Sequence, residues 1–494
     1  MNGPRPVEAT PTTPTLSATP APSAVLPDPA TATVTATATV LRRTLTVTVI
    51  GSVMAVLDMT IVNVAMRSLS ESFRAPLATI QWTATAYTLA LAAVIPVAAW
   101  AMGRIGARRT YATALVLFTL GSLLAACAWD AGSLIAFRAV QGLGGGLLQP
   151  VGMTLVMRVA DRDRLGRAMA VGGLPLLVGP VAGPVLGGWL VDTASWHWIF
   201  LVNLPVGLLA LALAVRLLPR DEPEARGRGT ARRQRLDVPG LLMLSPGLAL
   251  LLYGLARGGE RSDFTAPGAL LPTLAGAVLT AAFVRRALTV REPLLDLRLL
   301  RDRTFAAGIA TIALFTCGYF GSMLLGPLYW QQERGLSATA AGLLGAPSGL
   351  VVGTAMQCAA RWIDKASPRR LIPAGIALAA LGMVSLAWQA GVPGVAPWRM
   401  VTSAMLLGAG VGMVLMPTMT TATRQLPADR MASASTALSI NSQLGASVGT
   451  AVLSVVLGAA GQHPAGFRLT YAVAAVLLAL SALPALRLPG RRRP

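Results

Sequence analysis

Long apolar runs separated by short polar segments rich in arginine make up most of this chain. A helix of about 20 residues crosses the roughly 30 Å hydrocarbon layer of a bilayer, and about fourteen of the runs reach that length. The sequence therefore predicts an all-α integral membrane protein. The predicted spans are 44–66, 83–102, 110–129, 133–157, 169–191, 197–218, 238–256, 267–284, 305–329, 340–360, 371–390, 398–417, 432–459 and 467–486.

Arginine placement predicts the orientation of these spans. With a cytoplasmic N-terminus, 33 of the 41 Lys and Arg residues fall in segments on the inside, 7 fall outside, and Arg138 lies within a span. This bias follows the positive-inside rule and predicts that both termini are cytoplasmic. The net charge of +21 is then explained by loops that face an anionic leaflet, so we expect no nucleic-acid partner.

Composition agrees with a membrane protein, since 54% of the residues are hydrophobic, 12% are charged and the mean hydropathy is +0.63. We expect two six-helix halves and a pair of extra helices with a peripheral, structural role. The predicted organisation is a disordered cytoplasmic tail rich in Pro, Ala and Thr (1–41), an N-terminal half (42–218), a basic cytoplasmic linker (219–236), the extra pair (237–286), a cytoplasmic loop (287–304), a C-terminal half (305–486) and a basic cytoplasmic tail (487–494).

Asp58 is the one acidic residue deep within an apolar run. Counting 1.5 Å per residue places it about 21 Å from the inner edge of its span, where a charge costs about 2.5–3.5 kcal/mol by insertion scales. Burial disfavours the ionised form of a carboxyl group, so Asp58 is a candidate proton carrier. The alternative is an aspartate held permanently by hydrogen bonds, for example to Thr60 or Asn63.

Arg138 is the one basic residue within a span, at a depth from which its guanidinium could reach the level of Asp58. A positive charge that approaches the aspartate in one conformation and leaves it in another would make proton binding depend on conformation. The competing interpretation is a static salt bridge between the first and fourth spans.

The segment GPVAGPVLGG, from Gly179 to Gly188, lies within another apolar run. Gly179, Gly183 and Gly187 recur every four residues, which places them on one helical face where a neighbouring backbone can approach closely. Proline residues remove backbone donors and bend helices. We therefore predict a smooth, bent helix. Its prolines are Pro180 and Pro184.

These segments resemble motifs of a known family. The decamer resembles the antiporter motif of major facilitator superfamily exporters, and WHWIFLVNLPVG (196–207) resembles the span 5–6 signature of the fourteen-span drug:proton antiporters. LDMTIVNVA (57–65) and FRAVQGLGGGLLQP (137–150) are similar to that family's span 1 and span 4 motifs, with Gln141 and Gly142 matching the latter. The resemblance implies a major facilitator fold and assigns Asp58 and Arg138 to proton coupling.

The loop between the second and third spans departs from the family pattern. Gly103 stands where the family has an aspartate that helps to lock one conformation. The corresponding loop of the C-terminal half keeps an acid, so the gating charge pair could lie there, although simple anchoring to the inner leaflet explains the basic residues equally well. The candidate gating residues are Arg104, Gly106, Arg108, Arg109, Asp364, Arg369 and Arg370.

The expected function is proton-coupled export of amphiphilic drugs or toxic small molecules across the bacterial plasma membrane by a monomer that needs no cofactor or metal. No C-half span holds an acidic residue, which favours neutral, zwitterionic or monocationic substrates. Asn63, Gln141 and Tyr319 are candidate pocket residues. The alternatives are export of one dedicated metabolite, such as a host-made antibiotic or an amino acid, and a non-transporting receptor or scaffold. The chain has two histidines and no G-x-x-x-x-G-K loop, which argues against an enzyme and against ATP as the driving force.

Overall fold

Every regular element among the described residues is helical. The computed structural model describes Gly3 and residues 29–161, 165–173, 175–220, 237–261, 263–290, 293–336, 338–362, 367–392, 394–427, 430–461 and 463–489. The α-helices are α1 Pro29–Phe73, α2 Leu77–Val94, α3 Val97–Ile105, α4 Ala107–Ala126, α5 Ala131–Val159, α6 Leu165–Gly172, α7 Pro175–Thr193, α8 Trp198–Leu201, α9 Asn203–Leu217, α10 Val238–Arg261, α11 Pro267–Thr289, α12 Arg303–Ser322, α13 Leu325–Leu328, α14 Ala338–Trp362, α15 Pro368–Ala390, α16 Pro397–Thr423, α17 Met431–Ala460, α18 Pro464–Leu480 and α19 Ala482–Ala485. A 3-10 turn occupies Leu297–Arg301, and a π-helical turn occupies Tyr329–Glu333.

Eleven helices of the described part of the chain are long and apolar enough to cross a membrane, or twelve if the bent pair α2 and α3 counts as one span. The bend of 56° falls at Ile95 and Pro96, where the proline has no backbone N–H to donate to the preceding turn. The predicted span 83–102 is therefore broken into two helices. The long helices α5 and α7 also belong to the bundle, and the total of fourteen spans stays a prediction.

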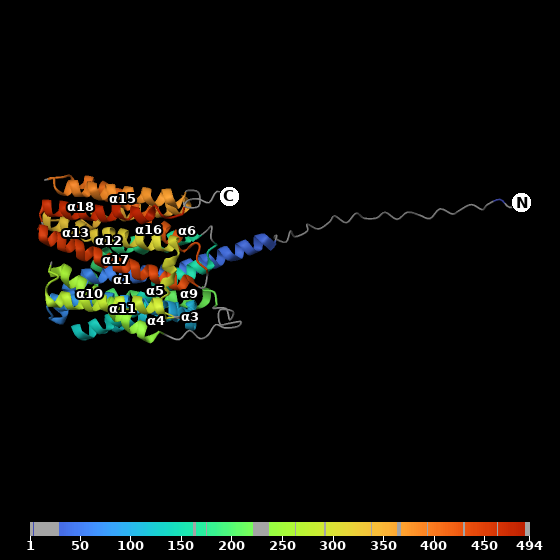
Figure 1. The fold of residues 1–494 in the computed structure, drawn as a ribbon. Coiled ribbons are helices and arrows are strands. Elements are labelled where there is room, and N and C mark those ends of the chain that lie inside the picture. Colours follow the sequence, from blue (N-terminus) through green and yellow to red (C-terminus); the bar gives the residue numbers. More distant parts are fainter. Residues whose placement is uncertain are drawn as a thin grey trace.

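Helix α1 begins earlier than the sequence suggested. Residues 29–41 were assigned to a disordered tail, but they form the first turns of α1, which is continuous from Pro29 to Phe73. Threonine and alanine alternate in this segment, and after the last proline nothing interrupts helical hydrogen bonding. The start of α1 projects beyond the bundle at the end where α3 and α6 lie (Figure 1).

Two sets of helices pack around separate apolar cores. In the N-terminal half, α4 packs on α5 and α9, α5 on α2, and α1 on α7. In the C-terminal half, α12 packs on α16, α17 and α18, and α16 packs on α14 and α15. The halves meet where α5 contacts α17, α6 contacts α14 and α16, and α7 contacts α14. At this junction the hydroxyl groups of Thr154 and Ser435 form a 2.5 Å hydrogen bond.

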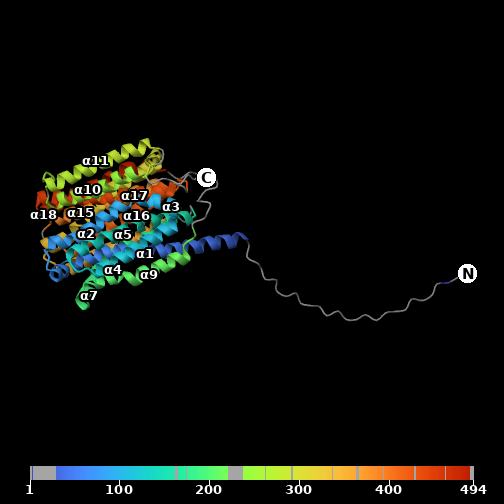
Figure 2. The same ribbon diagram turned by 90° about the horizontal axis from the view of Figure 1, so that it is seen from below.

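The extra helices α10 and α11 form a hairpin against both halves. Helix α10 contacts α2 and α17, while α11 lies at the outer edge of the bundle (Figure 2). The carboxylate of Asp237 accepts hydrogen bonds from the Gly240 backbone N–H at 3.0 Å and from Arg286 Nε at 2.9 Å, which ties the start of α10 to the end of α11. Only α11 is peripheral, since α10 bridges the two halves.

Helix α5, which carries Arg138, begins with a capping box. The carboxylate of Asp130 accepts a hydrogen bond from the backbone N–H of Ser133 at 2.6 Å, and the Ser133 hydroxyl accepts one from the backbone N–H of Asp130 at 3.1 Å. The bond from the Ser133 N–H favours the ionised carboxylate and holds the pKa of Asp130 below its ordinary value of 3.8. The cap therefore fixes where α5 starts, and with it the register of Arg138.

Because the pKa of folded Asp130 is depressed, its contribution to stability is present above the unfolded value near 3.8 and is lost as the pH falls through the folded value. We expect Asp130→Ala to unfold at a lower temperature than the wild type at pH 7. This difference should shrink as the pH drops below 4. Thermal unfolding of the detergent-solubilised protein, followed by tryptophan fluorescence, measures it.

Asp130→Asn is the matched control, because asparagine caps a helix as well as aspartate and carries no titratable group. It should unfold near the wild-type temperature at pH 7. Equal unfolding temperatures for wild type and Asp130→Ala at pH 7 would contradict a stabilising cap.

Candidate functional site

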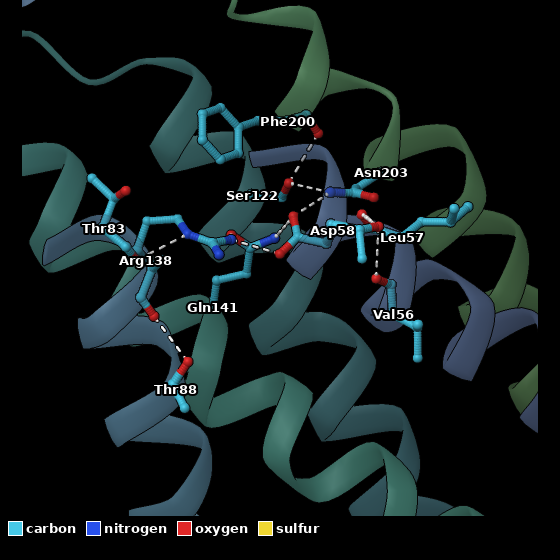
Figure 3. A network of polar contacts seen from close by, with 12 residues as sticks. Val56, Leu57, Asp58, Thr83, Thr88, Ser122, Arg138, Gln141, Phe200 and Asn203 are labelled. Atoms are coloured by element: carbon cyan, nitrogen blue, oxygen red, sulfur yellow. Dashed lines mark hydrogen bonds and ion pairs between the residues drawn. The ribbon is translucent and has the colours of Figure 1, made fainter. Parts of the chain in front are cut away.

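Asp58 is the centre of a buried polar network in the N-terminal half (Figure 3). Its Oδ2 lies 2.6 Å from Nη1 of Arg138, and its Oδ1 accepts hydrogen bonds from Gln141 Nε2 at 2.8 Å and Asn203 Nδ2 at 2.9 Å. The side chains of Asp58 and Arg138 are 0% and 1% exposed. Three N–H donors thus surround the carboxylate, an arrangement that suits its ionised form.

The guanidinium of Arg138 is held on several sides. Nη1 also donates to Gln141 Oε1 at 2.7 Å, and Nε donates to the backbone carbonyl of Thr83 at 3.4 Å. The guanidinium carbon lies 4.2 Å from the centre of the Tyr87 ring and 5.8 Å from that of Phe200. Aromatic faces attract cations, most strongly where water is excluded. The guanidinium of Arg138 is therefore enclosed by aromatic rings and polar partners, with 1% of its side chain exposed.

Protonation of Asp58 would upset this balance. Removing one partner of a buried ion pair leaves an uncompensated charge, at a cost of about 3–5 kcal/mol. A proton on Asp58 would leave the charge of Arg138 uncompensated, because the other neighbours of Arg138, which are Gln141, Thr83 and Tyr87, are neutral. A movement of the guanidinium towards water or another acceptor would relieve this cost. The arrangement can therefore link a proton to a movement of helices.

Thr60, one of the partners considered for Asp58 from the sequence, serves another helix. Its Oγ1 donates to the backbone carbonyls of Leu57 at 2.9 Å and Gly179 at 3.1 Å. It faces α7, whereas Asp58 faces the interior of the N-half. The side chain of Asn63 is outside the described part of the structure.

Glycines of α5 let the helices of this site approach one another. A Cβ at Gly142 would meet the backbone of Tyr87, one at Gly144 would meet the backbone of Phe118, and one at Gly146 would meet the backbone of Leu91. These backbone segments belong to α2 and α4, and they could make room only if the whole helix moved. The glycine run therefore brings α2 and α4 close enough for Tyr87 to reach Arg138.

The antiporter-like motif packs α7 against the helix that carries Asp58. A Cβ at Gly179 would clash with Val56, and one at Gly183 would clash with Thr60. At Gly187 it would come within 3.1 Å of the backbone carbonyl of Ile61. This arrangement agrees with the close helix contact expected from the spacing. The side chains of Pro180 and Pro184 are not among those described, Gly188 is partly exposed, and the bend of α7 stays a prediction.

A cavity of about 130 Å³ lies between the two halves, beside the polar network. Residues of α1, α2, α5, α6, α7 and α16 line it, and none of the described lining residues is acidic. Tyr87 forms part of its wall. Five methionines line it as well: Met59, Met153, Met169, Met416 and Met419.

Tyr319 lies in a different cavity. This second space, of about 270 Å³, is enclosed by C-half helices, and Trp330 and Tyr471 line it together with Tyr319. Gln141 belongs to the network around Asp58. The structure therefore does not gather the expected pocket residues at one place.

Comparison with known proteins identifies the family. A sequence model of the Major Facilitator Superfamily matches residues 48–450, which is most of the chain.

The chain belongs to the Major Facilitator Superfamily.

Two curated relatives of this superfamily member carry drug-resistance names. The chain is similar to "Multidrug resistance protein B homolog" of Mycobacterium tuberculosis, with 43% identity over 420 residues that cover 84% of this chain and 76% of the relative. It is also similar to "Putative multidrug resistance protein MdtD" of Cronobacter sakazakii, with 35% identity over 463 residues that cover 91% and 95% of the two chains.

Solved structures of the superfamily share this fold at low sequence identity. The proton:xylose symporter XylE aligns with a TM-score of 0.63 and 16% identity, covering 90% of this chain and 95% of its own. The human organic anion transporter MFSD10 aligns with a TM-score of 0.61 and 16% identity, covering 90% and 99%. These likenesses show the fold, and the family match together with the apolar helices identifies this superfamily member as a multi-pass membrane transporter.

The described candidate gating residues lie at the turn between α3 and α4 and in the first turn of α15. Gly106 joins α3 to α4 with a backbone φ of 93°, a conformation that glycine adopts without strain. Arg108 donates a hydrogen bond to the backbone carbonyl of Val215, which ties α4 to α9. Arg104, Arg109, Arg369 and Arg370 are exposed, and Asp364 falls outside the described residues. A gating role for these loops stays a prediction.

Two members of the site were not singled out from the sequence. Asn203 is part of the span 5–6 signature, yet an asparagine near a helix start is ordinarily a cap. From the sequence, Tyr87 is only one of four aromatic candidates for an apolar pocket, together with Phe315, Tyr319 and Phe320. What distinguishes both is their direction: each points towards a charge on another helix, and the sequence of one helix does not reveal that.

Gly183→Leu should abolish transport while sparing insertion into the membrane. Its side chain would occupy the position of Thr60 and push α7 away from α1 next to Asp58. We expect overpacking of this kind to lower the free energy of unfolding by about 1–3 kcal/mol. Drug-resistance growth assays, with protein abundance measured in isolated membranes, test this.

Gly268→Leu is the control, because Gly268 at the start of α11 is exposed and no atom lies within 4 Å of a Cβ built there. It should keep wild-type transport. If Gly183→Leu transports normally, close packing of α7 on α1 is not required.

Proposed function

We propose that this transporter exports amphiphilic drugs and other toxic small molecules in exchange for protons that flow inward across the bacterial plasma membrane. The observation that carries the proposal is the buried pair of Asp58 and Arg138 beside a cavity between the two halves. A charge pair this deep in apolar surroundings is costly to maintain. Proton coupling would explain why the protein contains this costly pair. The names of the bacterial relatives support drugs as the substrates.

The lining of the cavity supports a broad substrate range. Methionine is flexible and polarisable, so it adapts to ligands of different shape and recurs on promiscuous binding surfaces. Four helices contribute the five methionines. In the absence of an acidic lining residue, we propose neutral, zwitterionic or monocationic amphiphiles.

Contacts between the halves support alternating access, in which one half rocks against the other about the central cavity. Thr154 bonds to Ser435 at the end of the bundle near α6. Met416 of α16 packs there against Met169 of α6 and Met356 of α14. We propose that this end faces the cytoplasm, as the arginine distribution predicts, and that these contacts belong to a state closed towards the cytoplasm.

Several finer properties belong to the same proposal. Both termini lie in the cytoplasm, the working unit is a monomer, and no cofactor takes part. Gln141 and Asn203 act as positioning residues that hold the Asp58 carboxylate against Arg138. The alternative role of the pair as a permanent brace between α1 and α5 predicts that neutralising Asp58 spares coupling.

The deciding experiment is proton-gradient-driven uptake of rhodamine 6G, a fluorescent lipophilic cation, into inside-out vesicles. We expect the wild type to accumulate the dye and Asp58→Asn to lose at least 90% of that uptake, because the variant has no titratable group at the site. Collapsing the gradient with a protonophore should reduce wild-type uptake to the same level.

Asp263→Asn, in the loop between α10 and α11, is the control at equal expression and should retain wild-type uptake. Gradient-driven uptake that survives Asp58→Asn would favour the permanent brace and place the proton site elsewhere. A wild type that moves no dye would exclude broad specificity and favour a dedicated metabolite.

A further inference from the structure

Tyr87 forms the wall between the polar network and the central cavity. Its ring lies 4.2 Å from the guanidinium carbon of Arg138, and the same side chain lines the cavity. It is 1% exposed. A single aromatic ring therefore contacts both the charge that pairs with Asp58 and the space that holds a substrate.

The hydroxyl group of Tyr87 is buried and has no hydrogen-bond partner among the described residues. A buried hydroxyl without a partner loses its hydrogen bonds to water and regains nothing. Close packing keeps it in place, since a Cβ at Gly145 would lie 2.6 Å from its oxygen. Gly145, against which the hydroxyl packs, also lines the cavity, so a small movement of the ring would bring this unpaired donor to a ligand with an acceptor.

A second tyrosine in the same half provides the contrast. Tyr111 is equally buried, but its hydroxyl lies 3.4 Å from the backbone carbonyls of Val47 and Thr48. Tyr111 is not among the residues that line the cavity. The unpaired hydroxyl is thus not a general feature of the buried tyrosines in this half.

We propose that Tyr87 couples substrate binding to the protonation of Asp58, which deepens the proposed function and rests on it. Its hydroxyl donates a hydrogen bond to substrates that carry an acceptor such as an ester or carbonyl oxygen. Any substrate that fills the cavity presses the ring onto Arg138 and so stabilises the ion pair with ionised Asp58. Substrate binding then releases a proton, and proton binding weakens substrate binding by the same factor.

The groups that face Asp58 make this exchange local. Among the described side chains, Arg138 of α5 and Tyr87 of α2 are its titratable neighbours. Helices α4 and α9 contribute the neutral Ser122 and Asn203, and α7 faces the other side of α1 through Thr60. When Asp58 takes up a proton, it no longer offers Arg138 a negative charge. The guanidinium of Arg138 then moves away and no longer lies over the face of Tyr87. The ring is then free to leave the cavity wall.

The test measures binding and proton release on the purified full-length protein in detergent. Two probes are compared: rhodamine 6G, which carries an ester, and tetraphenylphosphonium, which carries no hydrogen-bond acceptor. Binding is followed by tryptophan fluorescence, and released protons are followed with a pH dye in weak buffer.

Tyr87→Phe keeps the ring and removes the hydroxyl. We expect its Kd for rhodamine 6G to rise about five- to tenfold, its Kd for tetraphenylphosphonium to stay within twofold, and proton release per bound ligand to persist. Tyr87→Met fills a similar space without a ring face. It should bind tetraphenylphosphonium but release less than a third of the wild-type protons, and its rhodamine 6G uptake should no longer respond to the proton gradient.

Tyr111→Phe is the matched control and should leave every one of these values unchanged. Wild-type affinity of Tyr87→Phe for rhodamine 6G would overturn the substrate contact, and wild-type proton release by Tyr87→Met would overturn the coupling. If Tyr87→Met does not fold, the two-probe comparison on Tyr87→Phe still decides the contact. Wild-type behaviour of both variants alongside loss of uptake in Asp58→Asn would reject the role of Tyr87 and keep the proposed function. A wild type that binds neither probe would overturn both.

Discussion

The buried ion pair of Asp58 and Arg138 is the interaction on which the helices of the N-terminal half converge. Opposite charges attract strongly where water is excluded, but each charge also needs hydrogen bonds that replace its lost hydration. Asp58 and Arg138 obtain these from Gln141, Asn203 and the carbonyl of Thr83, which come from α5, α9 and α2. Helices α1, α2, α5 and α9 must therefore converge on one point. A movement of any of them changes the surroundings of the carboxylate.

Glycine makes that convergence possible. Where α5 meets α2 and α4, and where α7 meets α1, residues without side chains allow helix backbones to approach closely. In a bilayer, lipid tails are as apolar as leucine, so close packing and hydrogen bonds take over the role that hydrophobic burial has in water. The hydrogen bond from Thr60 to the carbonyl of Gly179 is of this kind. The polar site and the smooth helix faces are parts of one arrangement.

The sequence predicted the elements of this fold better than their mutual orientation. Asp58 and Arg138 stood out because an isolated charge in an apolar run is costly, and that cost does not depend on the fold. Asn203 and Tyr87 did not stand out, because their role depends on which side of the helix faces the charged residue of a neighbouring helix. Tyr319 and Gln141 were both candidate pocket residues, but Tyr319 lines a C-half cavity while Gln141 bonds to Asp58. The start of α1 and the break at Pro96 show that backbone hydrogen bonding determines where helices begin and end. Hydropathy alone does not locate these boundaries.

The hairpin of α10 and α11 makes the two sides of the transporter unequal. Two similar halves would present two equivalent boundaries to the surrounding lipid. Here α10 lies over the boundary between α2 and α17, while α7 and α14 meet directly on another side. Among the described helices, lipid molecules therefore encounter one seam covered by α10 and another where α7 packs directly on α14. Amphiphiles dissolved in the bilayer, rather than in water, would meet a protein with a preferred side of approach.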